Sequence, residues 1–163
     1  MQHRRSARAI LLNHQDHVLL IRHQDTTPVD PARPDMLCYW ATPGGGIEAG
    51  EQPYDTLGRE LQEELGLTDV AIGRPVGVRE VPLNLPEAGL VMSYETYFVC
   101  RVSDAPVLNH PGMSESEHQT LKAIRWWTRE ELVNTTEILR PGALPELIEN
   151  ALCAASEPVF LQD

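Results

Sequence analysis

The chain has 163 residues, 42% of them hydrophobic, and a formal net charge of −11. This length and apolar content predict one globular domain, residues 1–163, with a sizeable core. The negative charge argues against polymeric nucleic acid and anionic membranes as partners, because both need a basic footprint, but a bound cation can still reverse the local field for a small phosphate substrate.

The first 36 residues predict a β-hairpin and a loop. Residues 6–12 and 17–22 are aliphatic runs of strand length, and the polar residues 13–16 between them are typical of a turn. Residues 24–36 contain three prolines among small and acidic residues, which predicts a long loop. The apolar run at residues 9–12 is too short for a signal peptide, and no segment approaches the length of a membrane span.

A short strand, residues 37–42, is expected to lead into the loop Pro43-Gly44-Gly45-Gly46. Glycines let the backbone turn sharply and let a ligand approach closely. An amphipathic helix follows this loop. Its core-facing stripe repeats every four residues and consists of Leu57, Leu61 and Leu65. Pro53 suits the first helical turn, and Gly66 suits the left-handed position that ends a helix.

Three carboxylates, Glu60, Glu63 and Glu64, lie on one face of this helix, because positions i, i+3 and i+4 are neighbours there. A hard divalent cation such as Mg²⁺ or Mn²⁺ would relieve their mutual repulsion. A run of glutamates is most often only a solvated face, but that alternative leaves the glycine loop unexplained. The loop and the helix together favour a metal site.

The segment from Gly45 to Leu67 reads GGIEAGEQPYDTLGRELQEELGL and fills every fixed position of the pattern GX5EX7REUXEEXGU, where U is aliphatic. It resembles the Nudix box, the signature of enzymes that hydrolyse nucleoside diphosphates linked to another group. The resemblance implies an α/β fold, the Nudix α/β/α sandwich with a mixed β-sheet. It also implies that Glu51 and Arg59 form a buried pair that holds the loop against the helix, so we assign them to structure first.

In the reaction that the resemblance implies, water attacks a phosphorus of a diphosphate linkage with the help of Mg²⁺ or Mn²⁺. Glu60 and Glu64 match the positions that most often bind the metal, and Glu63 matches a further ligand or the general base. The carbonyl of Gly44 matches a backbone metal ligand. Glu63 and Glu64 are therefore the catalytic candidates within the box.

The rest of the chain predicts more strands and two helices. Three apolar runs read as strands, at residues 76–81, 94–102 and 124–127. Thr128 and Glu131 form a capping box that starts a short helix, and residues 144–154 predict an amphipathic helix. Residues 104–118 read as a polar loop. This order suggests a mixed sheet flanked by helices, which fits the fold that the resemblance implies.

A further carboxylate is expected outside the box. Glu115 and Glu117 lie just ahead of the strand at residues 124–127, about where many Nudix relatives place one. Glu117 is nearer the strand and is our catalytic candidate, whereas Glu115 is a weaker candidate for binding substrate. The alternative, a solvated loop, stays open for both.

Arginine and tryptophan side chains are candidates for contacts to the substrate. Arg22, Arg79 and Arg125 can clamp phosphate with their guanidinium groups, and we prefer Arg22. Trp126 and Trp127 point to opposite faces of their strand, so at most one faces a ligand. We keep Trp127 as a stacking candidate, although core packing is the more common role of such residues.

The expected partner is a small nucleotide, such as a nucleoside triphosphate, a nucleotide sugar or ADP-ribose, and a homodimer remains open. The three cysteines, Cys38, Cys100 and Cys153, include no C-x-x-C pair, so we expect reduced thiols in a cytoplasmic protein. The alternative function is a nucleotide-sensing Nudix-like module with weak catalysis. Such modules typically lose box carboxylates, and this chain keeps all of them, which favours the hydrolase.

Overall fold

The computed structural model of the chain describes residues 1–103, 121–153 and 157–161. The strands that it contains are β1 Gln2–Leu12, β2 Val18–Gln24, β3 Cys38–Ala41, β4 Gly44–Gly46, β5 Val70–Leu85, β6 Gly89–Val102, β7 Leu121–Trp127, β8 Leu139–Arg140 and β9 Val159–Leu161. The helices are α1 Pro53–Leu65, α3 Arg129–Asn134 and α4 Leu144–Leu152. None of the described helices is long and apolar enough to cross a bilayer.

All the strands belong to one mixed sheet with the order β8-β3-β2-β1-β6-β5-β9, in which β4 also pairs with β1 and β7 with β2. β1 runs parallel to β6 from the Gln2–Val91 pair to the Leu12–Arg101 pair. β2 meets β1 only at Leu12 and Val18 and continues beside β3 and β7. The short strand β4 pairs with β1 nearer its N-terminus, so it lies where β2 has diverged from β1.

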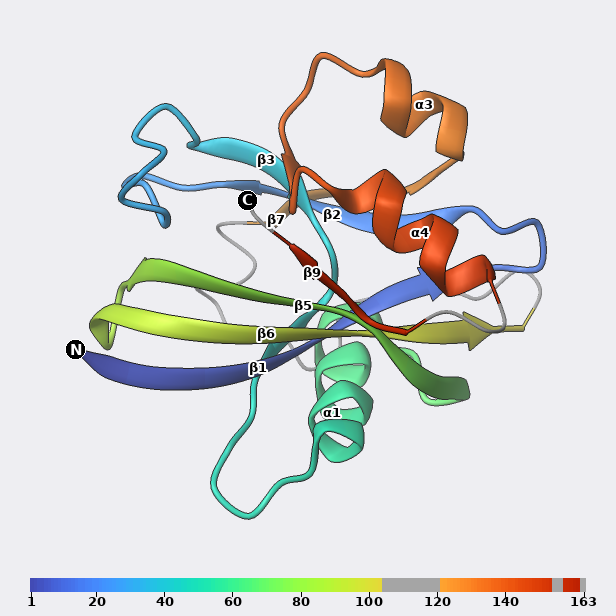
Figure 1. Ribbon diagram of the computed structural model, residues 1–163, viewed down its shortest axis with the longest axis horizontal. Coiled ribbons are helices and arrows are strands. Elements are labelled where there is room, and N and C mark those ends of the chain that lie inside the picture. Colours follow the sequence, from blue (N-terminus) through green and yellow to red (C-terminus); the bar gives the residue numbers. More distant parts are fainter. Residues whose placement is uncertain (104–120, 154–156, 162–163) are drawn as a thin grey trace.

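Helices cover both faces of the sheet, with α1 on one side and α3 and α4 on the other (Figure 1). Alternate residues of β1 belong to two separate cores, as expected of a strand buried on both faces. The core beneath α1 contains Ala7, Ala9, Leu11, Leu57, Leu61 and Leu65. The core beneath α4 contains Ile10, Leu12, Trp127, Leu144, Leu147 and Ile148. The expected α/β class with a mixed sheet and flanking helices is confirmed.

The helix ends follow the sequence signals. α1 begins at Pro53, and Gly66 adopts φ 69° and donates its N–H to the Gln62 carbonyl. In α3 the Glu131 N–H donates to the Thr128 hydroxyl over 3.1 Å, and the Thr128 N–H donates to the Glu131 carboxylate over 2.8 Å. Both predicted ends of α1 and the predicted capping box of α3 are therefore confirmed.

The strands differ more from the expectation. β5 and β6 are much longer than the predicted runs at 76–81 and 94–102. Glycine and proline weaken the strand pattern in β5, and the register with β6 shifts around Pro75. β4, β8 and β9 are only two or three residues long. They exist because each pairs with a longer neighbour, which no local pattern shows. The loop predicted at residues 104–118 lies outside the described part of the chain.

Candidate active site

The glycine strand β4 is fixed tightly against β1 and α1. Gly44 pairs with Arg8 of β1 and has φ 140°, and a Cβ there would overlap the carbonyl oxygen of Ala7. Only glycine fits such a conformation and such a contact. The Gly44 N–H donates to Oε1 of Glu64 over 2.9 Å, which ties the last turn of α1 to β4.

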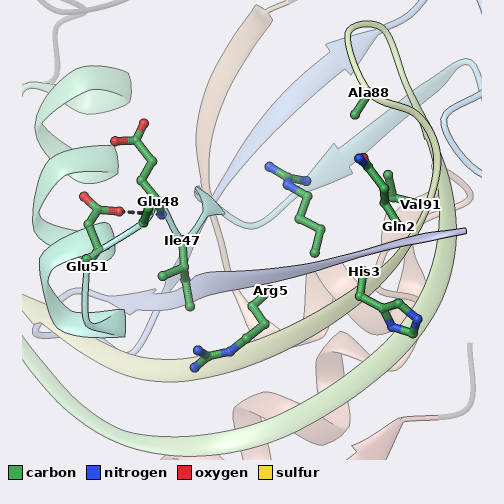
Figure 2. A pocket seen from close by; sticks show the side chains of 11 residues that line it. Gln2, His3, Arg5, Ile47, Glu48, Glu51, Ala88 and Val91 are labelled. Atoms are coloured by element: carbon green, nitrogen blue, oxygen red, sulfur yellow. Dashed lines mark hydrogen bonds between the residues drawn. The ribbon is translucent and has the colours of Figure 1, made fainter.

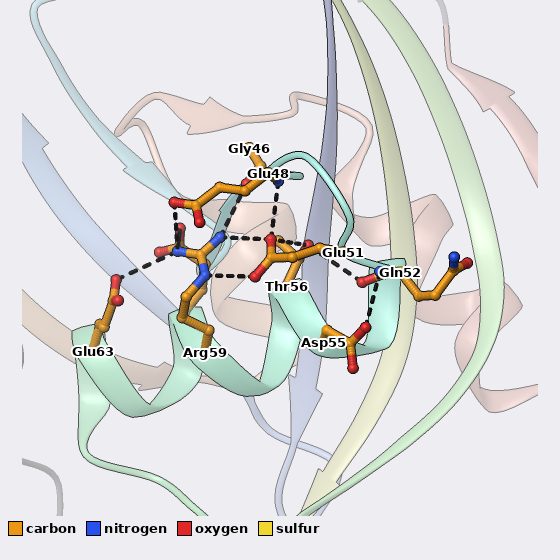
Figure 3. Close-up of polar contacts among 9 residues, drawn as sticks. Gly46, Glu48, Glu51, Gln52, Asp55, Thr56, Arg59 and Glu63 are labelled. Atoms are coloured by element: carbon orange, nitrogen blue, oxygen red, sulfur yellow. Dashed lines mark hydrogen bonds and ion pairs between the residues drawn. The ribbon is translucent and has the colours of Figure 1, made fainter.

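Arg59 is the centre of a network that joins α1 to the preceding loop (Figure 3). Its Nε donates to Oε2 of Glu51 over 2.8 Å and its Nη2 to Oε1 of Glu51 over 3.0 Å, a bidentate pair. Nη2 also donates to the Gly46 carbonyl over 3.2 Å. Nη1 donates to Glu60 over 3.0 Å and lies 3.6 Å from Glu63. One guanidinium thus holds the loop and faces the box carboxylates.

The Glu51–Arg59 pair has the predicted partners but is only half-buried, with exposed fractions of 18% and 25% for the two side chains. The expectation of a buried pair is therefore corrected. Hydrogen bonds from Arg59 and from the Glu48 N–H lower the pKa of Glu51 to about 2. The hydrogen bond to Glu51 in turn raises the pKa of Arg59. Both groups stay charged through the neutral range.

The three carboxylates of the box lie together on α1, as predicted, but in different environments. Glu64 is buried, the Glu60 side chain is largely buried, and Glu63 is 36% exposed. Burial raises the pKa of Glu60, and the charge of Glu63 raises it further against the opposing effect of Arg59. The protein therefore only partly compensates the negative charge of Glu60. A bound cation would compensate the rest of this charge.

The donor set fits a hard divalent cation in its chemistry, because it offers carboxylate oxygens on one helix face. Within the described residues, however, no group of three or more carboxylate, histidine or cysteine side chains is arranged so that it could hold a metal ion. The reason is visible in the contacts: Arg59 engages Glu60 and Glu63, while Glu64 accepts the Gly44 N–H. Metal binding would require these carboxylates to reorient.

A cavity of about 550 Å³ adjoins the loop that precedes α1. Figure 2 shows Glu48 and Glu51 at the end nearest α1, and Ala88 and Val91 at the other end. Arg4 also lines the cavity, and a Cβ on Gly46 would come within 2.7 Å of its guanidinium. The guanidinium of Arg4 therefore lies next to the glycine strand in this cavity.

The candidates outside the box fare differently. Arg22 is half-buried in β2 and makes no ion pair with any described residue, so its clamp role stays a prediction. Glu115 and Glu117 lie outside the described residues.

The predicted stacking of Trp127 on a ligand is wrong, because its ring is buried in the core. The ring contacts Trp40 edge to face, and the Arg125 guanidinium lies 3.9 Å from the ring centre. Core packing, the favoured alternative, is confirmed.

The structure also ranks the arginine candidates. Arg125 pairs with Glu131 at the start of α3, whereas Arg79 is 3% exposed and lies 3.7 Å from Glu95 inside the protein. Arg140 of β8 approaches the same carboxylate at 3.8 Å. Neither Arg140 nor Glu95 was a site candidate from the sequence. The alternation of Ser93 and Glu95 along one face of β6 was the available signal.

Comparisons with known proteins show what the whole chain is similar to. A family model described as NUDIX domain matches residues 2–147. The chain is similar to an RNA pyrophosphohydrolase of Bartonella quintana (strain Toulouse), with 33% identity over 72 residues that cover 44% of this chain and 40% of the relative. It is also similar to a putative 8-oxo-dGTP diphosphatase 2 of Mycobacterium tuberculosis (strain ATCC 25618 / H37Rv), with 48% identity over 53 residues that cover 31% and 37%.

The matches to these curated relatives thus span about 40% of the relatives' length. A solved structure of an ADP-ribose pyrophosphatase from Streptococcus suis matches over 97% of this chain and 98% of that chain. Its TM-score is 0.62 and its sequence identity is 20%. At this identity, the likeness shows the fold.

Proposed function

The chain belongs to the NUDIX family, and from that premise we propose that it is a metal-dependent pyrophosphohydrolase. Its substrate is a small nucleoside diphosphate linked to another group: a nucleoside triphosphate, a nucleotide sugar or an ADP-ribose type compound. The observation that carries the proposal is the joined assembly of β4 and α1. The Gly44 N–H donates a hydrogen bond to Glu64, and the Gly46 carbonyl accepts one from Arg59. These bonds hold the glycine strand and the three carboxylates as one unit.

Each residue of this unit has a proposed role. Glu60 and Glu64, with the Gly44 carbonyl, would hold Mg²⁺ or Mn²⁺, which when bound offsets phosphate charge and activates water. Glu63 is the most exposed of the three carboxylates, so it can accept a proton from the attacking water. Arg59 keeps the loop and the helix in register, because it donates to both Glu51 and the Gly46 carbonyl.

The substrate class follows from the charge of the chain. Two relatives act, by their names, on RNA and on 8-oxo-dGTP. This chain has 13 basic residues against 24 acidic ones, which does not suit the backbone of a long RNA. A metal ion can neutralise one diphosphate, but it cannot neutralise an extended phosphate chain.

A substrate panel tests this proposal. Nucleoside triphosphates, nucleotide sugars, ADP-ribose, dinucleoside polyphosphates and a capped oligonucleotide would each be incubated with the protein and Mg²⁺, and the products identified. We expect cleavage of at least one small nucleotide, with release of a nucleoside monophosphate. Efficient decapping of the oligonucleotide at physiological salt, with every small nucleotide left intact, would overturn the proposal.

Glu117 remains the proposed carboxylate outside the box. Replacing it by glutamine should lower turnover more than Glu115→Gln does, because Glu117 is nearer to β7 in the sequence. The two variants are matched in chemistry and differ by two positions, so each controls for the other. Thermal unfolding should be the same for both, and equal wild-type rates would show that the outer carboxylate lies elsewhere.

A further inference from the structure

A buried polar cluster lies on the face of the sheet opposite α1. The register places Ser6 of β1 beside Glu95 of β6, and Glu95 beside Arg79 of β5. Ser93 lies two residues before Glu95 on the same strand and on the same face. Arg140 of β8 approaches Glu95 as well. We call these five residues the arginine cluster.

The arginine cluster contains donors that no described residue satisfies. Arg79 is 3% exposed and Arg140 is 9% exposed. Within the described part of the chain, Nε and Nη1 of Arg79 and Nε and Nη2 of Arg140 have no hydrogen-bond partner. The same holds for the hydroxyl groups of Ser6 and Ser93. Buried donors are normally paired, so such a concentration calls for a ligand with several acceptor atoms.

Glu95 does not satisfy the unpaired donors of the two arginines. Its carboxylate lies 3.7 Å from Arg79 and 3.8 Å from Arg140, beyond the range of hydrogen bonds, and one of its oxygens already accepts the Tyr97 hydroxyl over 3.0 Å. Space is available: a cavity of about 290 Å³ is lined by both arginines. Two carboxylates also line it: Asp30, which accepts the Ala32 N–H, and the exposed Glu80.

Positive charge exceeds negative charge at the cluster. Burial alone would raise the pKa of Glu95, but the charges of Arg140, Arg8 and Arg79 outweigh burial and lower it. Glu95 is therefore ionised, and the three guanidinium groups of Arg79, Arg140 and Arg8 face two carboxylates, Glu95 and the buried Asp30 near Arg140. In a chain with a net charge of −11, this interior excess of positive charge is complementary to an anion.

The cluster is connected to the box through β1. Residues 6–8 of this strand pair with β4 on one edge and with β6 on the other. Arg8 donates to the carbonyl of Thr42, just ahead of the glycine strand, and it is also close enough to Glu60 to lower its pKa. Arg8 therefore interacts electrostatically with both Glu60 of the box and Glu95 of the arginine cluster.

We propose that the arginine cluster is an anion-binding subsite, where Arg79 and Arg140 hold an anionic group that the substrate carries in addition to its scissile diphosphate. That group is a phosphate or a carboxylate. The inference rests on the proposed function for the identity of the substrate, but not for the binding of the anion itself. The preferred substrate then carries one more negative group than a plain nucleotide sugar.

The first experiment measures anion binding without metal. The thermal midpoint of the whole chain is recorded in EDTA with increasing inorganic phosphate, against sodium chloride of equal ionic strength. Phosphate should raise the midpoint of the wild type and of Glu64→Gln, because a ligand that binds only the folded state stabilises it. Arg79→Gln should remove the rise.

Two further variants control this measurement. Arg33→Gln changes a basic residue of the same cavity whose side chain is 49% exposed, and it should keep the rise. Ser93→Ala removes only one buried hydroxyl and should weaken the rise, which provides a second test if Arg79→Gln does not fold. A wild type that responds no more to phosphate than to chloride overturns the subsite, as does an unchanged rise in both Arg79→Gln and Ser93→Ala.

The second experiment identifies the anion with matched substrates. UDP-glucuronate differs from UDP-glucose by a carboxylate, and ADP-ribose 2′-phosphate differs from ADP-ribose by a phosphate. We expect kcat/KM to favour the more anionic member of one pair by about 10- to 100-fold, the scale of a charged hydrogen bond. Arg79→Gln should remove that preference and spare the neutral member. Equal kcat/KM within both pairs overturns the proposal.

The two proposals fail in different ways. Metal-dependent hydrolysis without phosphate binding in EDTA removes the subsite and leaves the enzyme. Phosphate binding that depends on Arg79, in a chain that hydrolyses none of the small nucleotides, keeps the subsite and removes the enzyme.

Discussion

Arg59 determines more of the site geometry than any other described residue of the box. Its guanidinium donates to Glu51, Glu60 and the Gly46 carbonyl, so it joins α1, the loop and β4. It also faces Glu63, a candidate for the reaction itself. Its present contacts with two of the carboxylates mean that a bound cation competes with Arg59 for them.

The Glu51–Arg59 pair should contribute pH-dependent stability. The pKa of Glu51 is lowered from 4.5 to about 2, so its stabilising effect is fully present above about pH 4.5 and is lost as the pH falls toward 2. Glu51→Gln should therefore lower the thermal midpoint by a constant amount from pH 5 to 8, and the gap to the wild type should close below about pH 4.5. Glu130→Gln, at an exposed position of α3, is the control. A gap of unchanged size at the lowest pH would contradict this account.

The residues of the Nudix box could be identified from the sequence, because they lie close together in the chain and their spacing places the carboxylates on one helix face. The partners of Arg59 were only partly foreseen: Glu51 was expected, whereas the contact with the Gly46 carbonyl depends on how the loop folds back. Arg79 could not be ranked among the arginine candidates and Arg140 was not foreseen, since their burial arises where residues of β5 and β8 approach Glu95. Such a meeting joins residues far apart in the chain.

The glycines of β4 and α1 should respond in opposite directions to alanine. In Gly44→Ala the new Cβ would overlap the Ala7 carbonyl at φ 140°, so β4 must move and the bond to Glu64 is strained. We expect a loss of about 1–3 kcal/mol in the free energy of unfolding, together with lost activity. Gly58→Ala faces open space on the exposed side of α1 and should gain about 0.5–1 kcal/mol.

Urea denaturation of both alanine variants, with the slope against urea concentration compared with the wild type, measures these changes. A Gly44→Ala protein as stable as the wild type would show that β4 is not fixed as the contacts indicate. The comparison is informative because both substitutions add the same methyl group within one short segment of the chain.

The helices and strands that could be predicted are those whose sequence signals act over only a few residues. α1 has a stripe of leucines, a proline at its start and a glycine at its end, and each of these acts within a few residues. β4 has no side chain to make a pattern, and β8 is two residues long. Their strand character comes from pairing with β1 and β3, so the sequence alone could not show it.

At the scale of the whole molecule, acidic and basic side chains gather in different places, which the net charge of −11 does not show. Carboxylates gather on α1 and its preceding loop, while arginines gather inside the sheet around Glu95. The mixed sheet makes this possible, because β1 borders the box strand on one edge and β6 on the other. The overall charge therefore did not reveal how charge is distributed in the interior of the protein.

The central claim is that the α1 carboxylates support a metal-dependent hydrolysis. It is tested most directly by titrating Mg²⁺ against the turnover of the substrate found in the panel, for the wild type, Glu64→Gln and Glu130→Gln. Glutamine at position 64 can still accept the Gly44 N–H, so the fold is kept while the charge is lost. We predict no turnover in EDTA, wild-type turnover for Glu130→Gln, and a loss of about 10²- to 10⁴-fold for Glu64→Gln at saturating Mg²⁺. Full turnover in EDTA, or in Glu64→Gln, would contradict the account.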